Sequence, residues 1–317
     1  MSAQSVLVTG ATGFVGGAVV ERLAADGRRV PVAGSRRSVS VPEGAELAVT
    51  PSLGAEADWS GALQGVEAVV HTAARVHVMD ESAADPLAEY RRANVDGTLA
   101  LAQQAAHAGV RRFVFVSSIK VNGEQTSPGS SFSAADAPAP VDPYGVSKAE
   151  AEAALFALGR QTGMEIVVVR PPLVYGPGAG GNFARMVRWV GKGVPLPLGA
   201  VNNRRSLVGL NNLVDLLVTC LDHPAAVNQV FLAGDGEDFS TAGLVRRVAA
   251  AMGRNPRLLP VPPAILRIVA RSLGRGDMAQ RLLDSLQVDI SHTRETLGWA
   301  PPVSVDEGLR RAVAPTR

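Results

Sequence analysis

The sequence has little of what marks several large classes of protein. It contains a single cysteine, Cys220, so no internal disulfide can form, and it has no C-x-x-C pair for zinc or a redox centre. Its 31 basic and 29 acidic residues leave a net charge of only +2, and no Lys/Arg run is long enough to follow a phosphate backbone. No apolar run is long enough to span a bilayer, and residues 1–4 are polar and uncharged, unlike a signal peptide. We therefore expect a cytoplasmic protein without a membrane or nucleic-acid partner.

What the sequence does contain is an alternation of short apolar runs and longer amphipathic stretches. Its 317 residues allow two domains, or one large unit with an added lobe, and 46% hydrophobic with 19% charged residues is typical of a folded protein. Helical patterns separate the apolar runs, and the longest covers residues 85–108. The alternation predicts an α/β fold with a doubly wound parallel sheet of the Rossmann type. We predict its strands at residues 6–9, 29–33, 46–50, 68–71, 113–116 and 165–169.

The last third of the chain is richer in predicted helices than the rest. The clearest break before it is the glycine-rich stretch 176–181. We predict one domain at 1–175 and a smaller, helix-rich lobe at 176–317, from which some segments return to the first domain. The segment 125–143, rich in Ser, Ala and Pro, is interpreted as a surface loop. Helical patterns in the lobe occupy residues 182–192, 212–221 and 240–252, and a further strand is predicted at 230–232.

A glycine-rich turn follows the first predicted strand and leads straight into a helical pattern. It reads Thr9-Gly10-Ala11-Thr12-Gly13-Phe14-Val15-Gly16. Glycine permits a tight turn, close approach of the backbone to a pyrophosphate and close packing of helix on strand, while the helix N-terminus attracts the anion. We therefore predict that the domain at 1–175 binds a dinucleotide. The residues that hold it here are Gly10, Gly13, Phe14, Val15 and Gly16.

The second predicted strand ends without the acidic residue that holds the ribose 2′-hydroxyl in NAD enzymes of this fold. In its place the sequence has Gly34-Ser35-Arg36-Arg37. A hydroxyl and two guanidinium groups suit a 2′-phosphate, which a carboxylate would repel. We therefore favour NADP(H), held by Ser35, Arg36 and Arg37. If the arginines only solvate the strand end or stack on adenine, NAD(H) is the alternative.

The segment Tyr144-Gly145-Val146-Ser147-Lys148, at the start of another helical pattern, carries the predicted catalytic pair. One helical turn places Tyr144 and Lys148 on the same face. We expect the ammonium group to lower the pKa of the phenol and to hold the cofactor ribose, while the phenol exchanges a proton. Ser118 follows the strand at 113–116 and offers a hydroxyl to the same substrate oxygen. The pattern predicts catalysis by Ser118, Tyr144 and Lys148.

Two further segments, His71-Thr72-Ala73-Ala74 and Asn94-Val95-Asp96-Gly97-Thr98, complete a resemblance to a known family. Over nearly its whole length, the chain resembles the extended short-chain dehydrogenases/reductases of the NAD-dependent epimerase/dehydratase family, which includes the sugar-nucleotide epimerases. The resemblance implies that Ala73 and Ala74 lie beside the cofactor diphosphate. It also implies that Asn94 supports the catalytic lysine through a relay. Without that role, Asn94 would be a capping or helix-kinking residue.

The resemblance extends into Arg170-Pro171-Pro172-Leu173-Val174-Tyr175-Gly176-Pro177, the crossing to the substrate lobe. There the backbone at Pro171 is expected to meet the nicotinamide amide. Leu173 stands where the family has an asparagine, so the sugar or phosphate contact of that residue must be missing or replaced. Ser52-Leu53 departs from the Asp-containing pair that contacts adenine, which leaves those contacts to the backbone.

Besides Ser118, five positions are predicted to contact the substrate. By resemblance, Asn182 reaches the substrate diphosphate and Arg205 binds the nucleotide phosphate, for which a guanidinium fork is well suited. Arg281 lies near the family's second phosphate arginine, although its spacing is inexact. Lys120 and Asn122 replace a small residue and a tyrosine of the family, and both are expected to line the site. Lys120 could bind a hydroxyl, a carboxylate or an N-acyl oxygen of the sugar, or be a solvated loop residue.

These residues predict an NAD(P)-dependent enzyme that moves a hydride at C4 of a nucleotide-activated hexose, with UDP as the expected nucleotide. With a 4-ketosugar and exchangeable NADPH it would be a reductase, and with retained NAD it would be a 4-epimerase. A 4,6-dehydratase is less well supported, because Ile119 and Lys120 follow Ser118 where dehydratases have an acidic residue. The resemblance implies a homodimer through the helices at 85–108 and after Tyr144.

Two other functions remain open at this point. One is reduction of a non-nucleotide ketone, which would leave Asn182 and Arg205 without an anion to bind. The other is a non-catalytic dinucleotide sensor, which would have no need of Tyr144 and Lys148. No spacing of His, Cys or acidic residues predicts a metal site.

Overall fold

The computed structural model describes residues 4–76 and 85–314, without the side chain of Asp277. Seven strands form one parallel sheet in the order β3-β2-β1-β4-β5-β6-β9. From β1 the chain adds β2 and β3 on one side of the sheet, and it then adds β4 and the later strands on the other side. Sheets of this kind bind ligands in the crevice at such a change of direction, so the carboxyl ends of β1 and β4 border the expected ligand site. The predicted fold and all six predicted strands are confirmed. The strand bounds are β1 Gln4–Thr9, β2 Arg29–Ser35, β3 Glu46–Val49, β4 Val66–His71, β5 Arg112–Val116, β6 Glu165–Arg170 and β9 Gln229–Leu232.

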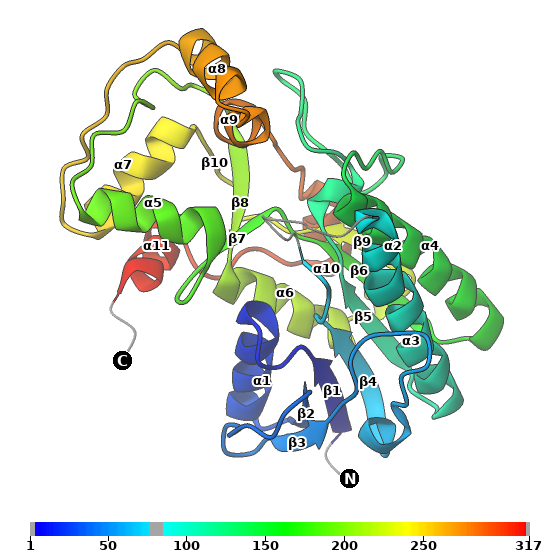
Figure 1. The fold of residues 1–317 in the computed structure, drawn as a ribbon. Coiled ribbons are helices and arrows are strands. Elements are labelled where there is room, and N and C mark those ends of the chain that lie inside the picture. The colour runs from blue at the N-terminus through cyan, green and yellow to red at the C-terminus, as the bar shows by residue number, and fades with distance from the viewer. Residues whose placement is uncertain (1–3, 77–84, 315–317) are drawn as a thin grey trace.

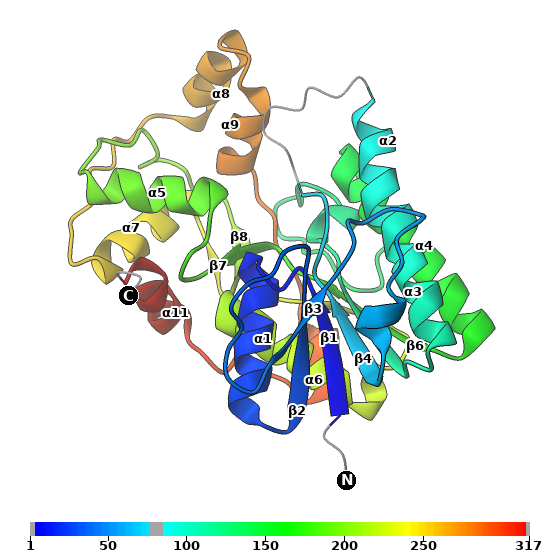
Figure 2. The same ribbon diagram turned by 60° about the horizontal axis from the view of Figure 1, so that its bottom comes forward.

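Helices cover both faces of this sheet (Figures 1 and 2). Side chains of β1 alternate between the two cores, with Val6 and Val8 on one face and Leu7 on the other. All three are fully buried, which explains why the strand reads as one continuous apolar run. The helices are α1 (Phe14–Asp26) and α6 (Leu210–Asp222) on the first face, and α3 (Gly97–His107) and α4 (Pro143–Thr162) on the second.

The long helix predicted at residues 85–108 is interrupted. It consists of α2 (Pro86–Arg91), a π-helical turn at Arg92–Asp96, and α3. The Asp85 side chain caps α2 by accepting the N–H of Ala88 at 3.0 Å. A π turn holds one residue more than an α turn and changes which side chains face inward. In this chain the turn contains Asn94, which is buried.

A second lobe lies beyond the carboxyl ends of the large sheet (Figure 1). Its small sheet has the order β10-β8-β7, and its helices enclose a separate apolar core. The predicted cap of the helix at 240–252 is present, because Ser240 Oγ accepts the N–H of Gly243 at 2.9 Å. Residues after 175 contribute to both sheets, through β9 and β8, and the division at 175 stays a prediction. The bounds are β7 Leu173–Tyr175, α5 Gly181–Gly191, β8 Arg205–Gly209, β10 Asp238–Phe239, α7 Thr241–Ala251, α8 Pro263–Ser272, α9 Gly276–Leu283, α10 Ser291–Leu297 and α11 Val305–Val313.

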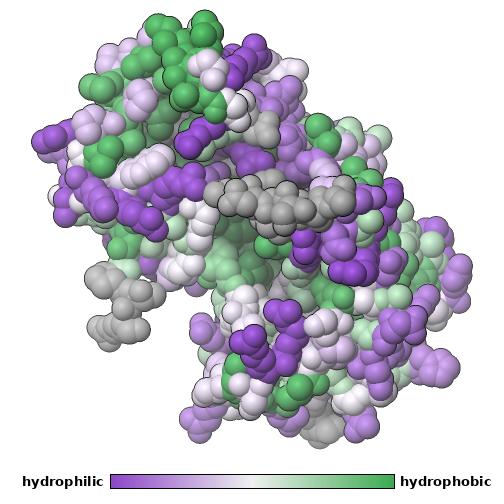
Figure 3. Space-filling model, in the orientation of Figure 1, coloured by the Kyte–Doolittle hydropathy of each residue, from purple (hydrophilic) through white to green (hydrophobic). Residues whose placement is uncertain are grey.

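The least buried helix of the lobe is α8. It exposes a group of apolar side chains that shows as a green area at the top of Figure 3, including Ile268 and Ile265, which are 68% and 50% exposed. Only Leu266 and Ala270 on this helix pack against the core of the lobe. Within residues 4–76 and 85–314, no helix is long and apolar enough to cross a membrane.

Candidate active site

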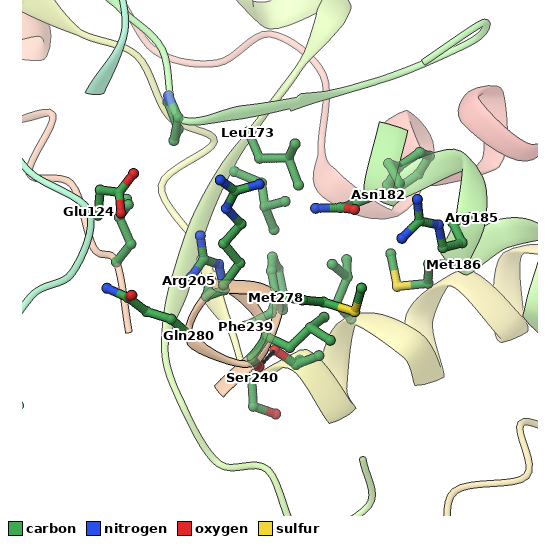
Figure 4. Close-up of a pocket in the computed structure, with 18 of the residues that line it drawn as sticks. Glu124, Leu173, Asn182, Arg185, Met186, Arg205, Phe239, Ser240, Met278 and Gln280 are labelled. Carbon is green, nitrogen blue, oxygen red and sulfur yellow. Dashed lines mark hydrogen bonds between the residues drawn. The ribbon is translucent and has the colours of Figure 1, made fainter. Parts of the chain in front are cut away.

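A cavity of about 330 Å³ lies between residues that follow β5 and β6 and residues of the second lobe. Its walls come from segments far apart in the sequence, among them β8, α5 and α9, and Figure 4 shows these side chains directed toward one space. The structure therefore brings Ser118 and Tyr144 together with most of the predicted substrate residues, whereas Lys148, Asn94 and Asn122 are not among the residues that line the cavity. Those that line the cavity are Ser118, Lys120, Tyr144, Pro171, Asn182, Arg205 and Arg281.

Ser118 and Tyr144 are placed by two local structures. Ser118 follows β5 and begins a 3-10 turn, in which its Oγ accepts the N–H of Lys120 at 3.3 Å. Tyr144 lies in the first turn of α4, where Pro143 is the first helical residue and Asp142 caps the helix by accepting the N–H of Gly145 at 2.7 Å. Cap and proline fix where α4 begins, so Tyr144 faces the cavity that Ser118 also lines.

The phenol of Tyr144 is held in its neutral form. Burial raises its pKa above the ordinary value, and the nearby Asp142 carboxylate raises it further, whereas a hydrogen bond with Ser118 lowers it. We expected this pKa to be lowered by Lys148, but it is raised, because burial and Asp142 dominate it. In this state Tyr144 is a proton donor with Ser118 as its hydrogen-bond partner.

Lys148 is fully buried one turn along α4 from Tyr144. Its Nζ donates to the carbonyl oxygen of Val116 at 2.8 Å and lies 4.2 Å from the ring centre of Phe115. Burial lowers the pKa of Lys148 to about 7, against the opposing charge of Glu152. The amine therefore sits at the back of the site and changes protonation near neutral pH.

Asn94 contacts α4 through a serine and not through Lys148. Its Nδ2 donates to Ser147 Oγ and to the carbonyl oxygen of Arg75, both at 3.0 Å, and its Oδ1 accepts the N–H of Arg75 at 2.8 Å. Ser147 in turn donates to the carbonyl oxygen of Tyr144 at 2.8 Å. Asn94 thus ties the segment after β4 to the first turn of α4, and its support of the lysine stays a prediction.

The predicted cofactor residues gather at the carboxyl ends of β1, β2 and β4, which are neighbours in the sheet. Gly10 has a φ of +68°, and a Cβ on it would lie 2.9 Å from the backbone nitrogen of Ala73, which Ala74 follows. A Cβ on Gly16 would lie 2.3 Å from the Gly10 carbonyl oxygen. α1 starts after Gly13 without a side-chain cap, which leaves its first N–H groups without a side-chain acceptor. This turn fits a dinucleotide diphosphate.

The end of β2 is compatible with both cofactors. Ser35 is buried, and its Oγ accepts the N–H of Arg37 at 3.3 Å. Arg36 and Arg37 are exposed, and within the described chain neither guanidinium group has an ion-pair partner. The arginines are thus available to a 2′-phosphate, to the adenine ring or to solvent.

Lys120 lines the cavity, but two carboxylates hold it. Its Nζ donates to Glu124 Oε1 at 2.7 Å and also to Asp142. Lys120, Glu124 and Asp142 are all mostly buried, with 22%, 21% and 19% of their side chains exposed. Lys120 is therefore paired within the site, unlike a solvated loop lysine.

Asn122 belongs to a buried network, and the structure corrects our expectation that it lines the substrate. Its Nδ2 donates to the carbonyl oxygen of Ser133, and its Oδ1 accepts from Arg170 Nη1, both at 2.9 Å. Arg170 also pairs with Glu152 at 2.5 Å, and Ser117 donates to the same carboxylate. The network joins the ends of β5 and β6 to α4 directly behind the site.

Cationic side chains line the lobe side of the cavity. Arg205, at the start of β8, donates from Nη1 to the carbonyl oxygen of Asp284 at 3.1 Å. Burial lowers the pKa of Arg205, while Asp284 opposes that shift. Arg281 and Asn182 line the same cavity from α9 and α5. Together they form a polar wall suited to a diphosphate.

Sequence reasoning missed several lining residues. Arg185 lies three positions after Asn182 on α5, so helical spacing could have placed it in the site. Glu124 and Gln280 had no comparable signal, because only the packing of the two lobes brings their segments together. Further lining residues that were missed include Met186, Trp189, Phe239 and Met278.

The fold and this arrangement define the class of protein. The fold is a Rossmann-type sheet with a glycine-rich turn, and Ser118 and Tyr144 line one cavity with Lys148 buried one turn further along α4; this combination is that of a short-chain dehydrogenase/reductase. The model of the NAD dependent epimerase/dehydratase family matches residues 6–234. The chain belongs to this family, within the extended short-chain dehydrogenases/reductases.

Individual relatives agree with this assignment. The chain is 48% identical over 309 residues to a UDP-glucose 4-epimerase from Vibrio cholerae, covering 97% of this chain and 94% of the relative. The UDP-glucose 4-epimerase of Thermotoga maritima, solved with UDP-glucose, has a TM-score of 0.77 at 24% identity and covers 98% and 97% of the two chains. The UDP-glucuronic acid 4-epimerase of Bacillus cereus, solved with UDP-glucuronic acid and NAD, has a TM-score of 0.79 at 22% identity and 98% coverage of both chains.

These comparisons bear on the cofactor. The family description names NAD, and the Bacillus cereus structure contains NAD. The family description favours NAD(H), the alternative in our sequence analysis, and it lends no support to the preference for NADP(H).

Proposed function

We propose that the protein is an NAD-dependent 4-epimerase of a UDP-hexose. The observation that carries this proposal is a single cavity that Ser118 and Tyr144 line together with the cationic side chains of Arg205 and Arg281. A hexose joined to a nucleoside diphosphate is the substrate whose two parts match these two groups of residues, the hydroxyls for the sugar and the guanidinium groups for the phosphates. The relative from Vibrio cholerae, at 48% identity, supports the same reaction.

The residues of the chain have distinct parts in this proposal. Ser118 positions the C4 oxygen, and Tyr144 exchanges its proton with that oxygen, giving it to a C4 carbonyl and taking it from a C4 hydroxyl. Lys148 and the glycine-rich turn at Gly10 hold the dinucleotide. Bound NAD supplies the hydride acceptor and donor for C4. Arg205 holds the diphosphate while the sugar presents either face of C4 to the nicotinamide.

A 4-ketosugar reductase is the second candidate. It is favoured by one observation, the absence of an acidic residue at the end of β2, where Ser35 is followed by two exposed arginines. A reductase needs an exchangeable cofactor, whereas an epimerase returns the hydride to its substrate and retains the cofactor. The relative affinities of the protein for NAD(H) and NADP(H) therefore distinguish the epimerase from the reductase.

We expect NADH to bind at least as tightly as NADPH. Arg36 and Arg37 are exposed at the end of β2, so a contact between their guanidinium groups and the 2′-phosphate of NADPH would be screened by salt and add little to its affinity. The measurement is a pair of dissociation constants at low and moderate ionic strength. Replacement of both arginines by alanine serves as the control and should leave NADH affinity nearly unchanged. If the parent binds NADPH more tightly than NADH at low salt, and the double alanine variant loses this preference, the result would favour the reductase.

Arg205→Ala is expected to weaken UDP-sugar binding by about 1.5–3 kcal/mol, because it removes a charged hydrogen-bond donor from the phosphate end of the cavity. Dinucleotide affinity should change little. Arg204→Ala is the matched control, since Arg204 is exposed and outside the cavity lining. Isothermal calorimetry with a UDP-sugar measures the difference, and equal affinity in the parent and Arg205→Ala would refute this placement. A non-nucleotide ketone substrate would give that result.

A further inference from the structure

The cavity is electrostatically uneven along its length. Among its lining residues the single carboxylate is Glu124, which pairs with the cationic Lys120, while Arg185, Arg205 and Arg281 are the other cationic groups. Figure 4 shows Glu124 at the opposite side of the space from Asn182 and Arg185, with Arg205 between them. The acidic side is the one that holds the catalytic residues, because Glu124 pairs with a lysine whose backbone N–H is bonded to the catalytic serine.

We propose that Glu124 is a specificity residue that admits a neutral hexose and excludes a sugar carboxylate. The inference rests on the proposed function, which places the sugar beside Ser118 and Tyr144 and the diphosphate on the arginines. It concerns the substituents of the sugar ring and adds a substrate class to that function: UDP-hexoses with hydroxyl or N-acyl groups, as opposed to UDP-uronic acids.

The charge around Lys120 carries the argument. A free lysine at the sugar end would attract a carboxylate, but Lys120 already donates to Glu124 at 2.7 Å and to Asp142. In this cluster one ammonium group thus meets two carboxylates. All three side chains are mostly buried, so water screens them poorly. A sugar carboxylate placed there would meet like charge, and its own desolvation would not be compensated.

The same geometry suits hydroxyl groups. An ionised carboxylate only accepts hydrogen bonds, so Glu124 can accept from a sugar hydroxyl or an N-acyl N–H. Lys120 keeps a third N–H that can donate to a sugar oxygen. Because Glu124 and Asp142 fix the ammonium group from two sides, that donor has a defined direction. Of the roles open to Lys120 from the sequence, the structure thus favours the hydroxyl and N-acyl oxygen over the carboxylate.

The test compares kcat/KM for 4-epimerisation of UDP-glucose and UDP-glucuronic acid. The parent protein, with NAD bound, is expected to prefer UDP-glucose by about 100-fold or more. Glu124→Gln should narrow that ratio by about tenfold, because the amide removes the repelling charge and offers an N–H to the carboxylate. Glu124→Asp keeps the negative charge and should keep most of the preference for UDP-glucose. This variant separates the effect of the charge from any effect of the substitution on folding. Glu295→Gln, on an exposed residue of α10, is the matched control and should change neither substrate.

The outcomes separate this inference from the function on which it rests. Similar kcat/KM values of the parent for both sugars, or an unchanged ratio in Glu124→Gln, would overturn the role of Glu124 and leave the 4-epimerase standing. Calorimetry with the same two nucleotide sugars gives a readout independent of turnover. A parent protein that binds neither sugar would refute the proposed function, and the inference with it.

Discussion

Replacing Tyr144 by phenylalanine is expected to lower kcat about 100- to 10,000-fold, the contribution typical of a general acid–base group. The phenol faces the cavity with Ser118, and burial raises its pKa, so it carries the proton that C4 chemistry requires. Phenylalanine keeps the ring and its edge contact with Tyr90, whose centre lies 6.0 Å away. The variant should therefore fold and bind the dinucleotide as the parent does.

Steady-state epimerisation of UDP-glucose measures this loss, and a fluorescence titration with NADH checks the cofactor site. Tyr90→Phe is the matched control: Tyr90 is a buried tyrosine beside the site but outside the cavity lining, and its loss should change kcat only a few-fold. Turnover of Tyr144→Phe within a few-fold of the parent would remove Tyr144 from the mechanism. Equal loss in both variants would point to packing as the cause.

Arg170→Met is expected to lower the free energy of unfolding by about 3–5 kcal/mol, because it leaves a buried carboxylate without its cationic partner. Arg170 and Glu152 are each 4% exposed, and two guanidinium nitrogens bond the same carboxylate. The same substitution also deprives the Asn122 oxygen of its donor. Urea unfolding followed by circular dichroism measures the change.

Two further variants make that result interpretable. Arg92→Met breaks an exposed pair with Glu89 and should cost at most about 1 kcal/mol. Arg170→Met combined with Glu152→Leu removes the orphaned charge as well, so the double variant should be more stable than Arg170→Met alone. If Arg170→Met costs no more than Arg92→Met, the network is not a structural support of the site.

The sheet could be predicted because its strands are buried on both faces. The run of Val6, Leu7 and Val8 is apolar throughout and is followed by a glycine-rich turn. This pattern is typical of a strand inside a parallel sheet that helices cover on both faces. The helices at 182–192, 212–221 and 240–252 were predicted within two residues of their observed bounds, since their apolar faces and the Ser240 cap are local features. The π-helical turn at Arg92–Asp96 was not predicted, because the apolar spacing around it is that of a continuous helix and no local residue marks the extra position.

The candidate site could be predicted only where short motifs carry it. Ser118, Tyr144 and Lys148 stand in such motifs, and the structure brings them to one place. The electrostatics could not be predicted in the same way. The pKa of Tyr144 is raised and not lowered, because burial and Asp142 outweigh any effect of the lysine, and both depend on tertiary packing.

The role of Lys120 could not be predicted either, because it also depends on tertiary packing. From the sequence it could be a ligand for several sugar groups or a solvated residue, since nothing local shows that Glu124 and Asp142 close around it. Asp142 is 22 positions away in the sequence. Asn122 was expected beside the substrate because it occupies the tyrosine position of the family, yet the distant Arg170 binds it inside the core.

The most direct test of the account is proton NMR of a UDP-hexose incubated with the purified protein and no added dinucleotide. With UDP-glucose or UDP-N-acetylglucosamine, the account predicts that the anomeric signal of the C4 epimer appears and that both signals reach a constant ratio while bound NAD is retained. An unchanged sugar spectrum for both substrates, persisting when the protein is saturated with NAD, would contradict it.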